Sequence, residues 1–524
     1  MVRERSTDLL IVGGGVGGCT AAMAACSLGL RVIMTEPTAW IGGQFTSQIV
    51  PTDEHPWIEH FGCTARYRKF RNSARTYYRD HYPLTPDARA NANLNPGRGW
   101  VSRLCIEPRV ALAIFDQMLA EARLRGLLEI WKFASPISTE MNGDQIESVQ
   151  IRDRDGNQYS VSAKYVIDAT ELGELLPLCN AEYVIGAESQ RETNEKHAVD
   201  GDAMPHDQQG ITWCFAMGYD PENDHTIEKP ARYEFWKQFQ PTFWPGPLLG
   251  WQYVNPHKME PSELPMFPRK SGDLSFFDYR RVICKENFQS EGLHEVTIVN
   301  WPQNDYFLEP IIDVTEDEFN ARVEDAKQLS LSLLYWLQTE APRNDGGTGY
   351  PGCYLRGDVT GTPDGFAMAP YIRESRRIKA EFTIFEQHVA AHAHPDADRA
   401  PGFFDSVGVG CYRLDLHPST GGRNTIDMHA LPFEIPLGAL IPVRIKNLIP
   451  ACKNIGTTHL TNGCYRLHPI EWNIGEAAGL LAAQCILQNY EMKEIRNDDA
   501  KLADFQRLCV AQGIELHWPK LGAI

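Results

Sequence analysis

Near the N-terminus, apolar and polar positions follow the order strand, glycine loop, helix and strand. The apolar run Leu9–Val12 has the length of a buried parallel strand. Glycines at 13, 15 and 18 follow with G-x-G-x-x-G spacing, and then come small residues at helical spacing. A second apolar run, Arg31–Thr35, ends at Glu36. This order predicts a βαβ unit, the motif on which dinucleotide sites are built.

The glycine spacing has a physical reason in such a site. Gly13 permits the tight turn after the strand, Gly15 lets the backbone approach a pyrophosphate, and Gly18 lets the helix pack closely on the strand. The helix N-terminus offers free N–H groups and a partial positive charge to the phosphates. Glu36 can accept hydrogen bonds from both ribose hydroxyls and would repel a 2′-phosphate, which disfavours NADP. The alternative is a glycine turn without a ligand.

Periodicity predicts the elements that follow. A helix is expected over 107–126, with Gly126 as its stop. Strands are expected after it, over 128–132, 146–152, 159–161 and 164–168.

In the C-terminal half, Thr315 and Glu318 form a capping box at the start of a helix. Another helix is predicted from Ala369 to about His392. Pro469 is well placed as the first residue of a small-residue helix. The tail thus predicts a short strand and loop over 448–456, followed by that helix over 470–488.

Three segments each have both a functional and a structural interpretation. Residues 65–81 predict an amphipathic helix whose arginines face either solvent or an anionic substrate group. Residues 232–253 are dense in aromatic side chains, which suits either an apolar substrate pocket or the core of an inserted domain. A second G-x-G-x-x-G at 347–352 lacks a preceding apolar strand, so we expect a loop there and no independent NAD(P)H domain.

Composition narrows the class of protein. The 524 residues suit about three domain-sized units, with 43% hydrophobic and 23% charged residues, as in ordinary globular proteins. The net charge of −18 argues against nucleic acid and anionic membranes as partners. No stretch has the length of a membrane span and no export signal is visible, so the expectation is a cytoplasmic protein with a small-molecule substrate.

The 13 cysteines include no C-x-x-C pair. This argues against disulfide reductase chemistry and against cysteine-ligated zinc or iron–sulfur centres. We expect buried, reduced thiols and no metal site.

The segment after Glu36 separates FAD from NAD. A Gly-Gly loop at 42–43 follows the acidic strand end, which resembles the glutathione-reductase-like flavoproteins with two dinucleotide-binding domains. In that class the second loop helps to hold the pyrophosphate and the flavin end, so FAD is favoured over NAD. The strand end 168–170, Asp-Ala-Thr, is similar to the Ala-Thr-Gly end that passes the FAD, with Glu171 replacing the glycine.

With the segment 372–378 and the tail 454–479, most of the chain resembles the FAD-dependent oxidoreductase family of this class. The resemblance implies an α/β fold: a Rossmann-like FAD-binding domain, with a parallel sheet, helices and a β-meander, plus an inserted α+β substrate domain. The expected boundaries are 1–50, 105–190 and 405–490 for the discontinuous FAD-binding domain, 190–404 for the substrate or cap domain, 51–104 for an irregular insertion near the active site and 491–524 for a C-terminal tail.

The resemblance also implies which residues contact FAD. The start of the 470–488 helix would lie under the flavin pyrimidine, where its N-terminus stabilises negative charge on reduced flavin. The implied FAD contacts run from the ADP half to the flavin: Gly13, Gly15, Gly18, Glu36, Gly43, Gln44, Ala169, Thr170, Asn454, Gly456, Glu471 and Asn473.

Candidate catalytic residues lie on the tail that the resemblance places beside the flavin. They are His459, Arg466 and His468, with Glu471 as a further candidate. Each also has a structural alternative: His468 as a helix cap, Arg466 as the partner of a carboxylate, and His459 as a packed core residue.

Three functions remain open from the sequence. An oxidase or dehydrogenase would take a hydride from a small organic substrate, with a base such as His459 accepting the proton. A flavin monooxygenase would instead require NAD(P)H from solution. A non-catalytic FAD-binding protein is the third. Neither the substrate, the electron acceptor nor the oligomeric state follows from the sequence.

Overall fold

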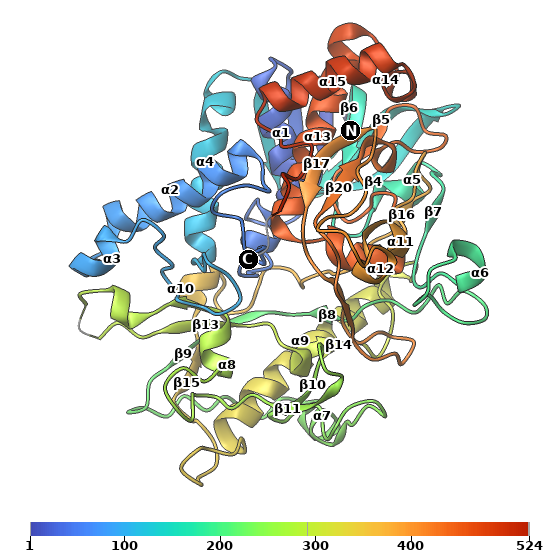
Figure 1. Ribbon diagram of the computed structural model, residues 1–524. Helices are drawn as coiled ribbons and strands as arrows, with labels where there is room; N and C mark the ends of the chain where they lie inside the picture. The colour runs from blue at the N-terminus through green and yellow to red at the C-terminus, as the bar shows by residue number, and fades with distance from the viewer. Residues whose placement is uncertain (1, 291, 522–524) are drawn as a thin grey trace.

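The computed structural model describes residues 2–290 and 292–521, and its centre is a largely parallel sheet (Figure 1). The parallel strands lie in the order β3-β2-β1-β6, and β21 pairs with β6 as well. Their carboxyl ends meet at one edge, where ligands bind in folds of this kind. The bounds are β1 (Arg3–Val12), β2 (Val32–Glu36), β3 (Leu128–Lys132), β6 (Gln158–Asp168) and β21 (Leu448–Pro450).

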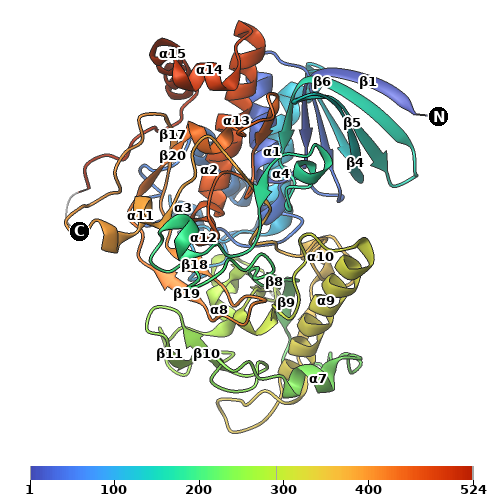
Figure 2. The ribbon, with the colours of Figure 1, turned by 90° about the vertical axis from the view of Figure 1, so that its right-hand side faces the viewer.

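Strand β6 joins this layer to an antiparallel meander, which Figure 2 shows as a fan of strands. The C-terminal half of β6 pairs with β21, and its N-terminal half pairs with β5 (Gln145–Asp153), which pairs with β4 (Ala134–Asn142). Strand β1 begins earlier than the predicted apolar run because its first half also pairs with β6. The predicted Rossmann-like sheet with a β-meander is confirmed.

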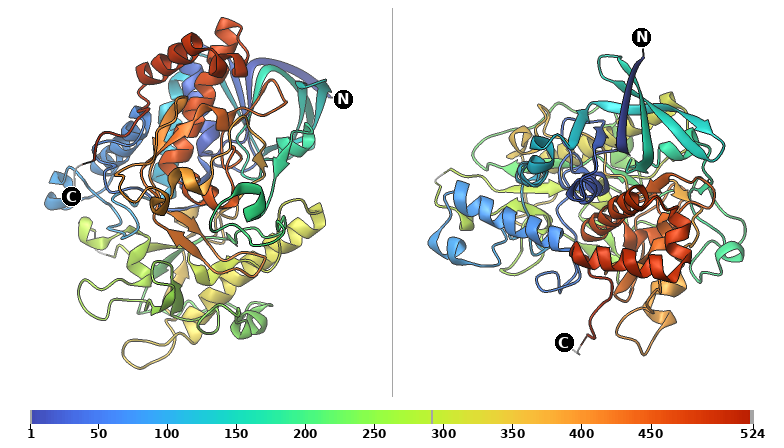
Figure 3. Two further views of the ribbon diagram at one scale, coloured as in Figure 1. Left: turned by 45° about the vertical axis from the view of Figure 1, so that its right-hand side comes forward. Right: turned by 90° about the horizontal axis from the view of Figure 1, so that it is seen from above.

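Helices α1 (Val16–Ser27) and α13 (His468–Gln488) pack against each other beside the sheet (Figure 3). Glycines allow the close approach: a Cβ added to Gly475 would lie 2.3 Å from Gly17 O, and one added to Gly479 would lie 2.4 Å from Ala21 O. This packing fixes the start of α13 next to the first glycine loop. The surrounding helices are α4 (Pro108–Leu124), α14 (Met492–Asn497) and α15 (Asp499–Ala511).

A second body with its own core lies below the central sheet in Figure 1. Helix α9 (Glu316–Thr339) starts at the predicted Thr315–Glu318 capping box and packs among short strands. Four of those strands form an antiparallel sheet in the order β12-β13-β9-β15. Their bounds are β9 (Phe215–Tyr219), β12 (Arg281–Ile283), β13 (Val296–Val299) and β15 (Cys353–Leu355).

Aromatic residues of the segment 232–253 form part of this second core. Tyr233, Trp236, Trp244 and Trp251 are buried in it. The core interpretation of the segment therefore holds for these four residues. The neighbouring elements are α7 (Tyr233–Gln238), β10 (Gln252–Asn255), β11 (Glu260–Glu263) and α8 (Phe276–Tyr279).

The remaining elements are short, apart from α2, which has the predicted bounds. The helices are α2 (Ala65–His81), α3 (Pro86–Ala90), α5 (Leu175–Leu178), α6 (Gln190–Thr193), α10 (Gly357–Thr360), α11 (Glu386–Val389) and α12 (His459–Tyr465). The strands are β7 (Tyr183–Val184), β8 (Ile211–Thr212), β14 (Asp305–Tyr306), β16 (Arg377–Ile378), β17 (Ser406–Gly410), β18 (Leu414–Leu416), β19 (Ile426–Met428) and β20 (Phe433–Pro436).

The helix predicted over 369–392 is wrong. The segment is mostly irregular, with the short strand β16 and the short helix α11. Its charged side chains are held by distant partners: Arg373 donates to Gly210 O at 2.7 Å, and Arg377 donates to Gly186 O at 2.7 Å. These tertiary contacts outweigh the local helical spacing.

Two further predictions concern loops and cysteines. The second G-x-G-x-x-G, at 347–352, is a loop. All cysteines are free, and each except Cys411 is buried. Among residues 2–290 and 292–521, no helix combines the length and the apolar character needed to cross a membrane.

Candidate functional site

A cavity of about 130 Å³ opens at the carboxyl ends of β1, β2 and β6. Both glycine loops and the acidic end of β2 contribute to its wall. Of the predicted FAD-binding residues, those that line it are Gly13, Gly15, Glu36, Gly43, Ala169 and Thr170.

The first glycine loop has the close contacts that its spacing predicts. Gly13 has a φ of +101°, and a Cβ added there would lie 2.3 Å from Ala169 O. A Cβ on Gly18 would lie 1.9 Å from Gly13 O, so only glycine lets α1 approach the strand. On Gly15 it would instead meet the Glu171 carboxylate, at 2.9 Å from Oε1. The Gly15 backbone therefore faces the cavity, as a pyrophosphate contact requires.

The second glycine loop packs directly on the first. The Gly42 amide donates to Gly14 O at 2.8 Å, and both Gly42 and Gly43 have positive φ angles. A Cβ on Gly43 would lie 3.0 Å from Glu171 Oε1. Glu171 thus places a carboxylate oxygen where the two loops meet, and this oxygen has no hydrogen-bond partner among the described residues.

Glu36 ends β2 inside the cavity and is only 3% exposed. Its Oε1 accepts hydrogen bonds from the Thr38 amide at 2.8 Å and the Thr38 hydroxyl at 2.6 Å. Burial raises the pKa of Glu36 to about 7, and the Thr38 hydrogen bonds only partly oppose this effect. The carboxylate is well placed to accept hydrogen bonds from ribose hydroxyls.

A buried lysine neutralises the acidic groups beside the glycine loops. The Lys453 ammonium pairs with Glu171 and lies 3.6 Å from Glu471 Oε2. Burial alone would lower the pKa of Lys453, but the neighbouring Cys452, Glu171 and Glu471 raise it well above its ordinary value. Lys453 therefore stays charged and supplies the cation in this cluster, which sequence analysis did not identify.

Gln44 and Glu471 connect the second glycine loop to the tail. Gln44 Nε2 donates to Glu471 and, at 2.9 Å, to Arg466 O. Glu471 Oε1 also accepts a long, 3.4 Å hydrogen bond from the Gly17 amide in the first turn of α1. The second glycine loop, α1 and the start of α13 therefore meet at these two buried side chains.

Three other predicted FAD-binding residues hold segments of the chain. Asn454 Nδ2 donates to Asp168 O at 3.0 Å, and Asn473 Nδ2 donates to Val407 O at 3.1 Å. A Cβ on Gly456 would lie 2.6 Å from Phe382 O. These three do not line the cavity, and neither do Gly18, Gln44 and Glu471. The contacts of all the predicted residues with FAD stay predictions.

Both ring nitrogens of His468 bind backbone groups. Nδ1 accepts from the Asp53 amide at 3.3 Å, which leaves Nε2 as the donor to Val50 O at 3.2 Å. Burial lowers the pKa of His468 to about 3, so the ring is neutral. Its position fixes the loop 50–53 on the start of α13, and it has no free nitrogen for a substrate.

His459 and Arg466 are likewise buried among partners. His459 Nδ1 lies 3.0 Å from Glu374 Oε2, and its Nε2 lies 2.7 Å from Arg423 Nη2. Arg466 Nη1 donates to Tyr371 OH at 2.8 Å, and Nη2 donates to Asp415 Oδ2 at 3.3 Å. The structural alternatives raised for these two residues thus describe their contacts here, and their catalytic roles stay predictions.

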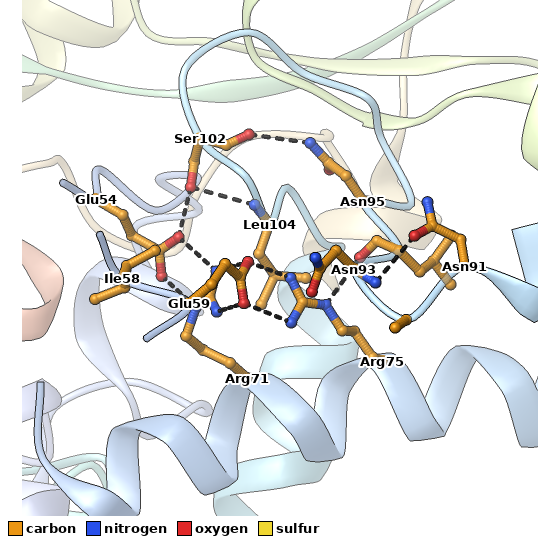
Figure 4. Close-up of polar contacts among 12 residues, drawn as sticks. Glu54, Ile58, Glu59, Arg71, Arg75, Asn91, Asn93, Asn95, Ser102 and Leu104 are labelled. Atoms are coloured by element: carbon orange, nitrogen blue, oxygen red, sulfur yellow. Dashed lines mark hydrogen bonds and ion pairs between the residues drawn. The ribbon is translucent and has the colours of Figure 1, made fainter. Parts of the chain in front are cut away.

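Two arginines of α2, Arg71 and Arg75, follow neither interpretation that the sequence left open, whereas Arg66, Arg68 and Arg79 are partly exposed. Arg71 and Arg75 are buried, and both pair with Glu59, while Arg71 also donates to Glu54 Oε1 at 2.8 Å (Figure 4). Burial alone would raise the pKa of Glu59, but hydrogen bonds from Arg71 and Arg75 hold it well below its ordinary value. These arginines pin the loop that precedes α2 instead of facing solvent or a substrate.

A polar cluster of which sequence analysis identified only Arg466 lies beside the second glycine loop. Its members come from five separate segments, and their charges act on one another. It is near the cavity through Gln44, which follows the cavity-lining Gly43 and donates to Arg466 O, and through Tyr371, whose chain neighbours Pro370 and Ile372 line the cavity. We define the polar cluster as Asp53, Tyr279, Arg280, Tyr371, Tyr412, Asp415, His417 and Arg466.

Within the polar cluster, His417 has an orienting carboxylate. Its Nδ1 lies 2.5 Å from Oδ2 of Asp305, and its Nε2 lies 3.8 Å from Asp415 Oδ2, beyond hydrogen-bond distance. Burial alone would raise the pKa of Asp305, but Arg373 and His417 lower it, so Asp305 is ionised. The sequence signal for this pair was weak, because 112 residues separate them.

Two glycine loops, an acid at the end of the second strand and a cavity between them define a dinucleotide-binding flavoprotein. The model of the family described as FAD dependent oxidoreductase matches residues 8–508, and the chain belongs to this family. The protein is therefore an FAD-dependent oxidoreductase, and FAD is its cofactor.

No curated protein matches the chain. Among solved structures, the quinol fumarate reductase of E. coli is 10% identical, with a TM-score of 0.33 over 98% of this chain and 74% of that chain. A geranylgeranyl bacteriochlorophyll reductase-like protein of Thermoplasma acidophilum is 14% identical, with a TM-score of 0.29 over 97% and 87%.

L-proline dehydrogenase from P. horikoshii is 14% identical, with a TM-score of 0.19 over 36% of this chain. This chain spans only 26% of that protein. Likenesses this distant carry no argument about substrate or reaction.

Proposed function

We propose that this FAD-dependent oxidoreductase takes a hydride from a C–H bond of a small organic substrate and works as an oxidase or dehydrogenase. The observation that carries the proposal is the position of the polar cluster, in which Arg466 O accepts a hydrogen bond from Gln44, the residue after the cavity-lining Gly43. Bound FAD supplies the two-electron acceptor. The β-meander next to the parallel strands supports placing the chain in the glutathione-reductase-like class.

In this proposal the FAD contacts follow the cavity wall. Glu36 accepts hydrogen bonds from the ribose, and Gly13 and Gly15 let the backbone lie against the pyrophosphate. Lys453 adds a fixed positive charge near the same glycine loops. The remaining contacts inferred from the family are Gly18, Gly43, Gln44, Ala169, Thr170, Asn454, Gly456, Glu471 and Asn473.

We assign proton transfer to His417. His468 binds backbone groups through both ring nitrogens, and His459 is enclosed by Glu374 and Arg423. His417 is oriented by Asp305 through Nδ1, and its Nε2 has no close hydrogen bond, so that nitrogen can take the proton of a substrate O–H or N–H. Arg466 adds a positive charge to the cluster and pairs with Asp415.

The test starts with the purified holoenzyme, which should be yellow and release about one FAD per chain. Candidate alcohols, amines and acids are then mixed with it anaerobically, and bleaching of the flavin absorbance identifies a substrate. Rapid bleaching by NADH or NADPH alone would favour the flavin monooxygenase instead. A colourless protein that takes up no added FAD would contradict the proposal at its base.

A further inference from the structure

Arg280 carries an unused hydrogen-bond donor inside the polar cluster. Its Nε donates to Asn300 O at 3.1 Å, which fixes the guanidinium, while the buried Nη1 has no hydrogen-bond partner within the described parts of the chain. The facing carboxylate oxygen, Asp53 Oδ2, lies 3.8 Å from Nη1, too far for a hydrogen bond. A buried N–H group without an acceptor is costly, so a ligand that supplies one is favoured.

A second guanidinium donor is unused in the same cluster. Arg466 is 2% exposed and uses both terminal nitrogens on Tyr371 and Asp415, but its Nε has no partner among the described residues. The polar cluster therefore presents two arginines with spare donors. Surface arginines with ordinary solvation do not give this pattern, because water satisfies them.

Tyrosine hydroxyls supply further donors. Burial raises the pKa of Tyr279 and of Tyr412, so both hydroxyls keep their protons near neutral pH. The Arg280 guanidinium carbon lies 5.4 Å from the centre of the Tyr279 ring, which holds the fork beside an aromatic face. The chemistry of this donor set is that of an anion site.

We infer that the polar cluster binds the carboxylate of a small organic acid, with Arg280 as the principal ligand. This inference rests on the proposed function, because it names the substrate class of the same site. The planar guanidinium fork matches a carboxylate through paired hydrogen bonds.

The charges of the polar cluster disfavour a ligand with more than one negative charge. Arg280 and Arg466 are already faced by Asp53 and Asp415, so the arginine and aspartate charges balance before a ligand enters. A phosphate dianion would bring two further negative charges close to these aspartates. We therefore place a carboxylate, and not a phosphate, in this site.

The test uses the holoenzyme and binding readouts that do not depend on turnover. Acetate and benzoate are titrated at constant ionic strength, followed by the difference spectrum of the bound flavin and by calorimetry. Acetamide and benzamide serve as neutral probes of the same sizes as the two carboxylates. Inorganic phosphate serves as an anion of different charge. We expect saturable carboxylate binding and at least tenfold weaker binding of the amides and of phosphate.

The variants Arg280→Met and Arg280→Lys test the assignment to Arg280. Both should weaken carboxylate binding at least tenfold, and the lysine variant keeps a positive charge in case the methionine variant folds poorly. Arg281→Lys is the matched control, because Arg281 points to Asp278 at 2.7 Å and to Gly97 O at 2.9 Å, and its carboxylate affinity should not change.

The outcomes separate this inference from the proposed function. Carboxylate affinity that is unchanged in both Arg280 variants, with a full complement of FAD, would overturn the inference and leave the proposed function intact. Phosphate binding tighter than carboxylate binding, or equal binding of the amides, would overturn it as well. Absence of FAD from the wild-type protein would instead remove the proposed function.

Discussion

His417 Nδ1 lies 2.5 Å from Oδ2 of Asp305, and this pair joins two segments that are remote in the sequence. Asp305 is fully buried and also pairs with Arg373 at 3.0 Å, so it is held ionised and acts only as an acceptor. The proton of His417 therefore sits on Nδ1, and Nε2 is directed to other partners. The arrangement resembles the way a buried carboxylate orients a catalytic imidazole in other enzymes.

The variant Asp305→Asn should slow reduction of the flavin by the substrate about tenfold or more, because the tautomer and orientation of His417 are no longer fixed. The pH profile of flavin reduction should flatten in His417→Gln. Anaerobic stopped-flow absorbance measures both effects with the substrate found by screening. Asp364→Asn is the control, since Asp364 pairs with Lys327 on the surface. Wild-type rates and profiles in both site variants would exclude the pair from proton transfer.

The affinity of the apoprotein for FAD should depend on pH through Glu36. The pKa of Glu36 is raised to about 7 by burial, whereas ribose hydrogen bonds require the ionised carboxylate. Binding therefore releases a proton below that pKa, and the association constant should rise about tenfold per pH unit up to pH ~7 and then level off. Fluorescence titration measures it.

Glu36→Gln should remove this pH dependence, and Glu36→Ala should weaken FAD binding by about 1–3 kcal/mol at neutral pH. Gly15→Val should weaken it further, because the side chain would occupy space that faces the cavity. A pH-independent wild-type affinity, or an unchanged dissociation constant in Glu36→Ala, would remove Glu36 from the FAD site.

Lys453→Met should weaken FAD binding by roughly 10- to 100-fold and lower the melting temperature. The change leaves the acidic side chains of Glu171 and Glu471 close together without their cation. Adding Glu171→Gln should restore part of the melting temperature, because one of the two charges is removed. Lys196→Met, on an exposed side chain, is the control. Wild-type affinity and stability in Lys453→Met would contradict the assigned role.

Acidification should destabilise the protein partly through His468. Its folded-state pKa of about 3 lies below the ordinary value, so the unfolded chain binds a proton that the folded chain excludes. The stability from this group is present above pH 6.5 and is lost as the pH falls toward 3. Between pH 6.5 and 4 the loss amounts to about 3 kcal/mol.

His468→Asn keeps an acceptor for the Asp53 amide but does not titrate. Denaturant unfolding at a series of pH values should therefore show a shallower acid dependence for the variant than for the wild type. Identical slopes in the two proteins would show that His468 is protonated as easily in the folded state as in the unfolded chain.

Much of the FAD-binding fold followed from the sequence, because its signals are local. The strand, glycine loop, helix and acidic strand end of residues 9–36 lie within one short segment, and the structure contains all of them, although β1 begins at Arg3 instead of Leu9. Helix α2 and the capping box at Thr315 are local in the same sense. Their backbone preferences and hydrogen bonds involve neighbours along the chain.

Tertiary structure decided the rest. The helix expected over 369–392 gave way to an extended path, because Arg373 and Arg377 find buried partners far away in the sequence. Arg71 and Arg75 form a buried ion-pair network because Glu54 and Glu59 fold back onto α2.

The sequence by itself determined the cofactor and the family of this protein, since both depend on short motifs whose residues are neighbours. It did not show the polar cluster, in which Asp53, Arg280 and His417 come from three distant segments. No local pattern relates such residues. Their charges interact strongly, and their unused donors need a partner, only after folding places them in one buried space where solvent no longer forms hydrogen bonds with them.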